Sequence, residues 1–309
     1  MSPKRKSFSA FHGAFLVDKP KGLTSHDVVA RMRRIAGTRR VGHTGTLDPF
    51  ATGVLVILVG NATRLARFID KSEKSYQATI SFGYETDTGD LTGEPREAGS
   101  EASVPENAVL LDLLENAAKD FLGISKQIPP MYSAKKQDGK KLYELARMGV
   151  EVEREAVEVE VSALGFEDAG AQGEIIMTTS VSAGTYIRTL AEDLGKAIGV
   201  PCHLKDLRRT AAGEFDISES HGLEELAKAS EAEELSKLLI PMNDVAGHLS
   251  EQTLSESDVE DITLGRKVMA NTELDVGYIR LLAETGELVA IGEKASDGLV
   301  QPRIVFKSE

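Results

Sequence analysis

The apolar and polar positions of the 309-residue chain repeat with periods that predict alternating strands and helices. A run of apolar, β-branched residues from Val54 to Val59 is bounded by turn residues, which is typical of a buried strand. Residues 75–82 alternate polar and apolar side chains, as a half-buried antiparallel strand does. Residues 26–35 repeat apolar side chains at helical spacing, behind the capping candidates Thr24 and Ser25. These patterns predict a core built around a sheet.

The pattern changes at Pro241, and this change predicts two domains. Before it, further strands are predicted from Phe15, within residues 157–182 and from Leu207, and helices at 63–69 and 105–122. Residues 182–199 are predicted to run from a small-residue turn into a helix. After Pro241 come a short helix ending at Gly265 and three strand-like runs. We therefore predict an α+β fold on a largely antiparallel mixed sheet. The domain limits are a flexible tail at 1–10, a large domain at 11–244 with an insertion at about 127–154, and a small β-rich domain at 245–309.

Composition excludes several classes of protein. No apolar run approaches the length of a membrane span, and the N-terminus lacks the apolar segment of a signal peptide. Cys202 is the only cysteine, so no internal disulfide and no cysteine-rich metal site is possible. We interpret it as a small core residue. A chain with this cysteine usage fits a reducing cytoplasm.

The net charge of −13 is distributed unevenly. Residues 1–75 carry 14 Lys and Arg against 5 Asp and Glu, whereas residues 76–309 carry 22 against 44. An acidic chain with a basic N-terminal quarter can still bind a polyanion on one face. Arg31, Arg33 and Arg34 are predicted to point outward from the first helix, where they suit phosphate contacts. A solvated helix face is the alternative.

Residues 41–64 combine a glycine-punctuated loop with the apolar run, and they hold the side chains best suited to chemistry. Asp48 precedes Pro49, which disfavours the α region at the aspartate. We therefore expect a carboxylate on stiff backbone at the mouth of a buried strand, as a nucleophile or base requires. The alternative is a turn in which Asp48 caps backbone amides and His43 is structural. The glycines and threonines around both residues favour chemistry, because glycine permits close approach of a ligand.

Three other stretches carry charge in unusual patterns. Residues 127–154 interleave Lys with Tyr and Met, which suits an insertion that grips nucleic acid; a surface hairpin is the alternative. Arg188 lies near a predicted helix start, two residues after Tyr186, where it could pair with a carboxylate from another strand end or form a surface ion pair. The acidic loop from Glu85 lacks the ladder of an EF-hand, so we expect a solvated loop.

Six separated motifs resemble those of the tRNA pseudouridine-55 synthases of the TruB type, and the resemblance covers nearly the whole chain. They are LVDKPKGLTSHDVV, RRVGHTGTLDPFATGVL, KSYQATISFGYETDTGD, QIPPMYSAKKQDGKKLYELAR, GTYIRTLAEDLG and LRRT. The resemblance implies a pseudouridine-synthase-type catalytic domain. The segments GELVAIG and VQPRIVF resemble the PUA-type RNA-binding domain of these bacterial enzymes. One position departs from the pattern: Arg64 stands where many relatives have lysine, and we assign it no contact.

The resemblance implies a function for six side chains. Asp48 corresponds to the essential aspartate, and Arg188 to the arginine that pairs with it. His43 corresponds to the histidine that fills the space left by the flipped nucleotide, and Tyr76 to the aromatic residue that packs on the uracil. Two others correspond to residues that line the base pocket, Tyr186 and Leu207.

The implied activity is isomerisation of uridine-55 in the T-loop of tRNA to pseudouridine, by base flipping and without a cofactor or metal ion. The expected partner is the T-arm stem-loop of tRNA, for a cytoplasmic monomer with no membrane contact, no obligate protein partner and a possible added role in tRNA folding. Two alternatives stay open. A glycoside hydrolase would need a second carboxylate, and none stands in a comparable loop. A non-catalytic RNA-binding factor would not need Asp48, Tyr76 and Arg188 together.

Overall fold

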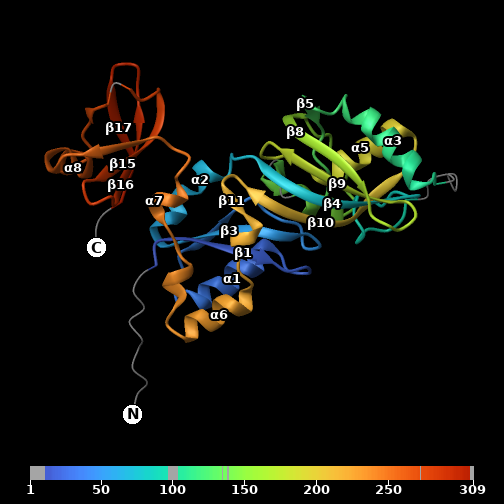
Figure 1. Cartoon of the computed structure of the whole chain (residues 1–309), viewed down its shortest axis with the longest axis horizontal. Helices are drawn as coiled ribbons and strands as arrows, with labels where there is room; N and C mark the ends of the chain where they lie inside the picture. Colours follow the sequence, from blue (N-terminus) through green and yellow to red (C-terminus); the bar gives the residue numbers. More distant parts are fainter. Residues whose placement is uncertain (1–10, 97–103, 134, 138, 272, 307–309) are drawn as a thin grey trace, which may run out of the picture.

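The structure, a computed structural model, describes residues 11–96 and 104–306, apart from positions 134, 138 and 272. The expected tail at 1–10 lies outside the described residues. Within them, ten strands form one large sheet and five form a second, smaller sheet that stands beside it (Figure 1). The predicted α+β class, with a large mostly antiparallel sheet and a separate C-terminal β domain, is confirmed.

The large sheet has the strand order β12-β1-β3-β10-β4-β9-β8-β5, and every neighbouring pair is antiparallel except β3 with β10. Two more strands lie off this path, where β2 pairs with β3 and β11 with β10. The bounds are β1 (Gly13–Lys19), β2 (Val41–Thr44), β3 (Thr52–Val59), β4 (Lys74–Phe82), β5 (Gly123–Gln127), β8 (Val157–Asp168), β9 (Glu174–Val181), β10 (Cys202–Ala212), β11 (Phe215–Asp216) and β12 (Ile240–Pro241).

Strand β3 joins the two halves of this sheet. Strand β1 covers one edge of β3 along its length, from Gly53 to Val59. The other edge is shared, because β2 pairs with residues 56–59 and β10 pairs in parallel with Thr52 and Gly53. The loop between β2 and β3, residues 45–51, therefore lies where the pairing partner of β3 changes from β2 to β10. This loop contains Asp48.

Alternate residues of β1 and β3 enter two different cores. Phe15, Leu55 and Ile57 belong to the core covered by helices. Leu16 and Val56 belong to the core on the opposite face, which also holds apolar residues of the C-terminal sheet. Strand β3 is thus buried on both faces, as its unbroken apolar run predicts.

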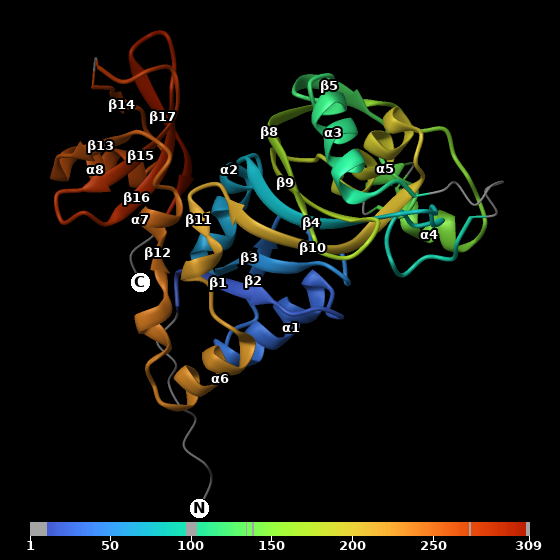
Figure 2. The same cartoon turned by 45° about the vertical axis from the view of Figure 1, so that its right-hand side comes forward.

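Helices cover the first of these faces in two groups (Figures 1 and 2). Helix α1 packs against α6 near β1 and β2, and α3 packs against α5 near β8 and β10. Helix α1 begins behind a capping box formed by Thr24 and Asp27, at the predicted position. The helices are α1 (Ser25–Ile35), α2 (Ala66–Ile69), α3 (Asn107–Ala118), α4 (Leu142–Arg147), α5 (Ile187–Ile198), α6 (Leu223–Glu231), α7 (Met242–Val245) and α8 (Glu256–Thr263), with 3-10 turns η1 (Gly60–Leu65), η2 (Ile217–Glu219) and η3 (Leu235–Leu238).

The smaller sheet packs onto the large domain through an apolar contact. Leu282, Ile304 and Phe306 are buried in one cluster with Leu16 and Val56. Its strand order is β13-β15-β16-β17-β14, with bounds β13 (Glu251–Leu254), β14 (Val268–Met269), β15 (Gly277–Ala283), β16 (Leu288–Lys294) and β17 (Leu299–Val305). The domain limit at 244/245 and the PUA likeness stay predictions.

Three local predictions differ from the structure. His43 was expected in a loop but belongs to β2, because its backbone pairs with Ile57 across a strand too short to show a period. The helix expected at 63–69 is a 3-10 turn followed by the four-residue α2. The strand expected from Leu207 begins at Cys202, which is buried as predicted. In the described part of the chain, no helix has the length and apolar character that crossing a membrane requires.

Candidate active site

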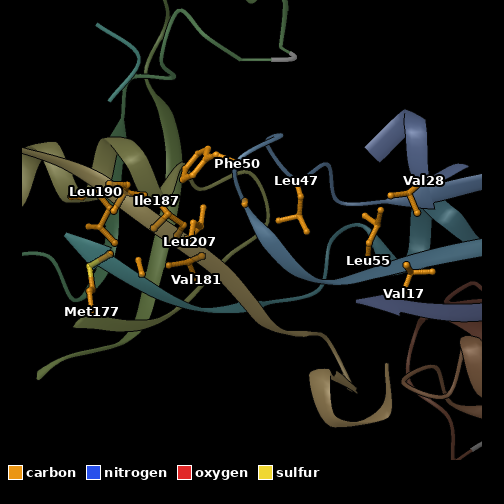
Figure 3. Close-up of a cluster of buried hydrophobic side chains, with 14 of the residues drawn as sticks. Val17, Val28, Leu47, Phe50, Leu55, Met177, Val181, Ile187, Leu190 and Leu207 are labelled. Carbon is orange, nitrogen blue, oxygen red and sulfur yellow. The ribbon is translucent and has the colours of Figure 1, made fainter. Parts of the chain in front are cut away.

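The loop that carries Asp48 is fixed at several points. The backbone amide of Ala51 donates to the Asp48 carbonyl at 3.1 Å, which closes a turn. The Ser25 hydroxyl accepts from the Leu47 amide at 3.0 Å. Leu47 and Phe50, on either side of the aspartate, are buried between apolar side chains of β9, α5 and β10 and those of β1, α1 and β3 (Figure 3). Asp48 is therefore held on stiff backbone, as the sequence predicts.

Arg188, in the first turn of α5, pairs with Asp48. Its Nε lies 3.0 Å from Asp48 Oδ2, and the arginine side chain is only 5% exposed. The rest of the guanidinium is also engaged, since Nη1 donates to the Thr88 carbonyl at 2.7 Å and Nη2 to the Tyr132 carbonyl at 2.6 Å. The predicted pairing of an arginine with a carboxylate from another strand end is confirmed, and it is not a surface ion pair.

A second carboxylate reaches the same guanidinium. Asp90 Oδ2 lies 3.6 Å from Arg188 Nη1, and Asp90 is 4% exposed. Its Oδ1 accepts from the Thr92 amide at 2.9 Å and from the Thr88 hydroxyl at 3.0 Å. The expectation of a solvated loop from Glu85 is wrong at Asp90, because the loop folds back onto α5 and buries this acid. No periodic pattern in this polar loop indicates that burial.

Burial and charge act in opposite directions on Asp48. Removal from water raises the pKa of the Asp48 carboxyl above its ordinary value, and the Asp90 charge adds to the rise. The Arg188 charge and hydrogen bond lower this pKa, and Lys19 lowers it slightly. Arg188 favours the ionised aspartate, but burial has the larger effect on this pKa. The arrangement produces a carboxylate of raised basicity beside a fixed cation.

A cavity of about 650 Å³ opens beside this pair. All six side chains singled out in the sequence line it: His43, Asp48, Tyr76, Tyr186, Arg188 and Leu207. They come from β2, the loop after it, β4, α5 with its preceding residue, and β10. Tyr186 is anchored by the buried Gln127, whose side chain accepts from the Tyr186 amide at 2.8 Å and donates to its carbonyl at 3.1 Å.

Two polar atoms in the cavity wall have no hydrogen-bond partner among the described residues, His43 Nδ1 and Ser133 Oγ. The His43 ring meets His26 edge to face at 5.5 Å between centroids. Burial and the His26 charge lower the pKa of His43, so the ring is neutral near pH 7. Buried polar atoms without partners are costly in a folded protein, and a polar ligand would satisfy them.

Arg209 is a further charged residue of the site that the sequence pattern did not reveal. It is 1% exposed, lines the cavity, and donates from Nε to the Val54 carbonyl at 2.8 Å and from Nη2 to the Gly45 carbonyl at 2.9 Å. Gly45 has φ +63°, and a Cβ on it would lie 3.0 Å from Arg209 Nη1. Arg209 thus fixes both ends of the loop that carries Asp48.

Two buried lysines support the same loop. Lys19, at the end of β1, is fully buried and donates from Nζ to the Leu23 carbonyl at 2.7 Å and the Pro49 carbonyl at 3.4 Å. Lys74 lines the cavity and donates to the carbonyls of Asp70 and Ser72. Burial lowers the pKa of each lysine to about 8. Both lie inside quoted motifs, but lysine is normally exposed, so pattern alone could not place them.

The predicted basic surfaces are present in part. Arg31, Arg33 and Arg34 are exposed on α1 as expected. The insertion at 127–154 contains a two-stranded hairpin, β6 (Lys136–Gln137) with β7 (Lys140–Lys141), followed by α4. Its first segment reaches the site through the Tyr132 carbonyl. Whether the insertion grips RNA stays a prediction.

This chain is similar to known proteins over most of its length. The family model described as TruB family pseudouridylate synthase (N terminal domain) matches residues 33–187, and the model described as tRNA pseudouridylate synthase B C-terminal domain matches residues 188–246. The tRNA pseudouridine synthase B of Solibacter usitatus is 39% identical over 298 residues, 95% of this chain and 99% of that protein. The tRNA pseudouridine synthase B of Geobacter sulfurreducens is 40% identical over 288 residues, 91% and 93% of the two chains.

Solved structures agree with these sequence matches. A chain of a Cbf5-Nop10-Gar1 complex superposes with a TM-score of 0.73 at 27% identity, over 96% of this chain and 85% of that one. A chain of an H/ACA RNP bound to a substrate RNA containing 2'-deoxyuridine gives a TM-score of 0.71 at 25% identity, over 96% and 86%.

Proposed function

The chain belongs to the TruB family of pseudouridylate synthases, and from this premise we propose that it isomerises uridine-55 in the T-loop of tRNA, with Asp48 as the essential residue. Its relatives are tRNA pseudouridine synthases, so the isomerase activity and the tRNA substrate follow from the family. The position of the uridine, the flipping of its base and the part played by Asp48 are the proposal. The observation that carries it is the ion pair of Asp48 and Arg188 in the wall of a cavity of about 650 Å³.

The reaction is an isomerisation in which atoms and electrons balance within the nucleotide. The N-glycosidic bond breaks, the base turns, and a carbon–carbon bond forms from the same sugar carbon to carbon 5 of the uracil. The hydrogen on carbon 5 leaves as a proton and one proton returns to nitrogen. Asp48, with its raised pKa, is placed either to attack the nucleotide as nucleophile or to take up a proton as base. Arg188 holds the carboxylate during either step.

The walls of the cavity suit a base that has left its stack. Extrusion of a base costs a few kcal/mol, and Tyr76 offers a ring on which the uracil can stack. The partnerless Nδ1 of His43 and Oγ of Ser133 offer hydrogen bonds to polar groups of the nucleotide. Leu207 and Tyr186 contribute apolar and aromatic surface. We assign His43 to the space that the flipped nucleotide vacates.

The glycoside hydrolase alternative is not favoured. Asp90 is a second buried acid near Asp48, but its oxygens are engaged by Thr88, Thr92 and Arg188 and it does not line the cavity. Asp70 does line it, but its Oδ1 accepts from the Gly45 amide at 2.9 Å. A general acid for sugar cleavage must reach the leaving oxygen. A role in tRNA folding needs only binding, and it can accompany the isomerase activity.

The test uses the purified chain and an unmodified tRNA transcript tritiated at carbon 5 of its uracils. Tritium release followed by mapping of the modified position should identify the T-loop uridine, and Asp48→Asn should bind the transcript but release none. Asp112→Asn, which alters an exposed acid of α3, is the matched control. Release by Asp48→Asn at the wild-type rate would exclude Asp48 as the essential residue. Release from a different uridine would overturn the assignment to position 55.

A further inference from the structure

Arg64 belongs to the 3-10 turn η1 and Arg67 to the helix α2 that follows it, but the two side chains make different contacts. Arg64 donates from Nη1 to the Val305 carbonyl at 2.6 Å and lies 5.4 Å from the centroid of the Phe306 ring, so it joins the two domains. Arg67 lines the cavity that contains Asp48. Among the described residues, Arg67 has neither a carboxylate nor a carbonyl partner.

Arg67 is instead held by two aromatic rings, one from each domain. Its guanidinium carbon lies 4.7 Å from the centroid of Phe68 and 5.7 Å from that of Tyr278 in β15. The two rings meet edge to face at 5.0 Å, with 71° between their planes. Phe68 is buried and Tyr278 is 41% exposed. Stacking on aromatic faces leaves the in-plane N–H donors of a guanidinium available.

The charge around Arg67 favours an anionic ligand. Lys71, one turn further along, is exposed and also lines the cavity, and Lys74 and Arg209 lie in the same wall. One acid of this segment, Asp70, lines the cavity too, and its Oδ1 accepts from the Gly45 amide at 2.9 Å. The cavity lining therefore holds five basic side chains against two acids, Asp48, which pairs with Arg188, and Asp70. A phosphate group presents oxygens that match the fork of an arginine.

We infer that Arg67 binds a backbone phosphate of the RNA at the mouth of the cavity and that Tyr278 of the C-terminal domain holds it in position. This rests on the proposed function, because the phosphate is that of the nucleotide strand entering the site. The C-terminal domain thereby contributes to substrate affinity through a residue of the catalytic domain. Because a phosphate contact is made equally before and during the reaction, it strengthens binding without changing the chemical step.

The first test is a kinetic comparison of Arg67→Gln with the wild type on the tRNA transcript. The KM should rise roughly 3- to 10-fold with kcat unchanged, and the salt slope of binding should fall by about 1. Arg64→Gln, three residues away, is the matched control, and it should lower thermal stability with the salt slope unchanged. An unaltered KM and salt slope in Arg67→Gln, or a fall in kcat, would overturn the inference.

The second test asks whether Tyr278 acts through Arg67. Tyr278→Leu should raise KM as Arg67→Gln does, and the double variant should be no worse than Arg67→Gln alone. Tyr278→Phe retains the ring and should recover most of the affinity lost in Tyr278→Leu. Additive effects of the two substitutions would refute the positioning by Tyr278. Filter binding of the transcript compares the affinities of the same variants without turnover. The inference about Arg67 and Tyr278 can therefore be tested even if the wild type modifies no uridine.

Discussion

Arg188 Nε and Asp48 Oδ2 lie 3.0 Å apart, although their residues are separated by 140 positions and belong to different elements. Two backbone carbonyls hold the other end of the guanidinium, one from the loop after β4 and one from the insertion. The position of Asp48 therefore depends on three segments that are brought together at Arg188.

Arg188→Lys should reduce activity although it retains the positive charge. A lysine has one nitrogen and cannot reach Asp48, Thr88 and Tyr132 together. Loss of charge-assisted hydrogen bonds of this kind should slow single turnover about 10- to 100-fold. The rate of tritium release at saturating enzyme measures it, and Arg31→Lys on the exposed face of α1 is the control. A wild-type rate in Arg188→Lys would mean that charge alone suffices.

The rate of single turnover should fall at acid pH, and Asp90 should influence where it falls. Burial raises the pKa of Asp48, so protonation begins above its ordinary value of 3.8 and removes the active carboxylate as pH decreases. The Asp90 charge contributes to that rise, so Asp90→Asn should move the acid limb to lower pH. Rates measured across the acid range for both proteins test this. A limb that stays in place or moves upward in Asp90→Asn would contradict it.

Lys19 and Lys74 should make the protein more stable as pH rises above 8. Each has a folded-state pKa of about 8 against an ordinary 10.5, so between these values the unfolded chain binds more protons and stability increases with pH. Urea unfolding at about pH 8 and about pH 10 should therefore show a smaller gain in Lys19→Met than in wild type. Lys71→Met removes an exposed amine and corrects for the loss of one surface charge. Equal gains in Lys19→Met and wild type would refute the burial effect.

Gly53→Ala should destabilise the protein by weakening the pairing of β3 with β10, which joins the two halves of the large sheet. Gly53 has φ +106°, and an added Cβ would lie 2.1 Å from the Arg209 carbonyl oxygen in the parallel pairing of β3 with β10. We expect a loss of more than about 2 kcal/mol in the free energy of unfolding. Gly265→Ala is matched in backbone conformation, with φ +82°, but its Cβ meets no described atom within 4 Å. It should cost about 1 kcal/mol. Equal losses of unfolding free energy in the two variants would show that strain from the positive φ, and not the contact between β3 and β10, causes the loss.

Much of this site could be predicted because its motifs are local. Asp48 with its turn, and Tyr186 with Arg188 at a helix start, each lie in one short stretch whose residues indicate the geometry. The unbroken apolar run of β3 likewise predicts burial on both faces, and the apolar cores on its two sides confirm it. That these stretches lie together in the fold was implied by the resemblance, since no periodicity in the sequence relates positions 140 residues apart.

The supporting charges could not be predicted in the same way. Lys19 and Lys74 each donate to a backbone carbonyl four residues away, and Arg209 donates to the distant Val54 carbonyl. Every residue has a carbonyl, so the residue types in the sequence do not indicate these contacts. Asp90 was hidden in a loop whose composition is that of a solvated turn. Arg64 had no assigned contact until its distant partners, Val305 and Phe306, were placed.

The parallel pairing of β3 with β10 also sets the order in which the strands of the large sheet can pair during synthesis on the ribosome. Strand β3 can pair at once with β1 and β2, which precede it, but the edge at Thr52 and Gly53 must wait for β10, roughly 150 residues later. At typical elongation rates that is roughly 10 to 30 seconds. For this time a strongly apolar strand has an open edge beside the unfinished site. The site is therefore expected to stay incomplete until β10, which carries Leu207 and Arg209, has been synthesised.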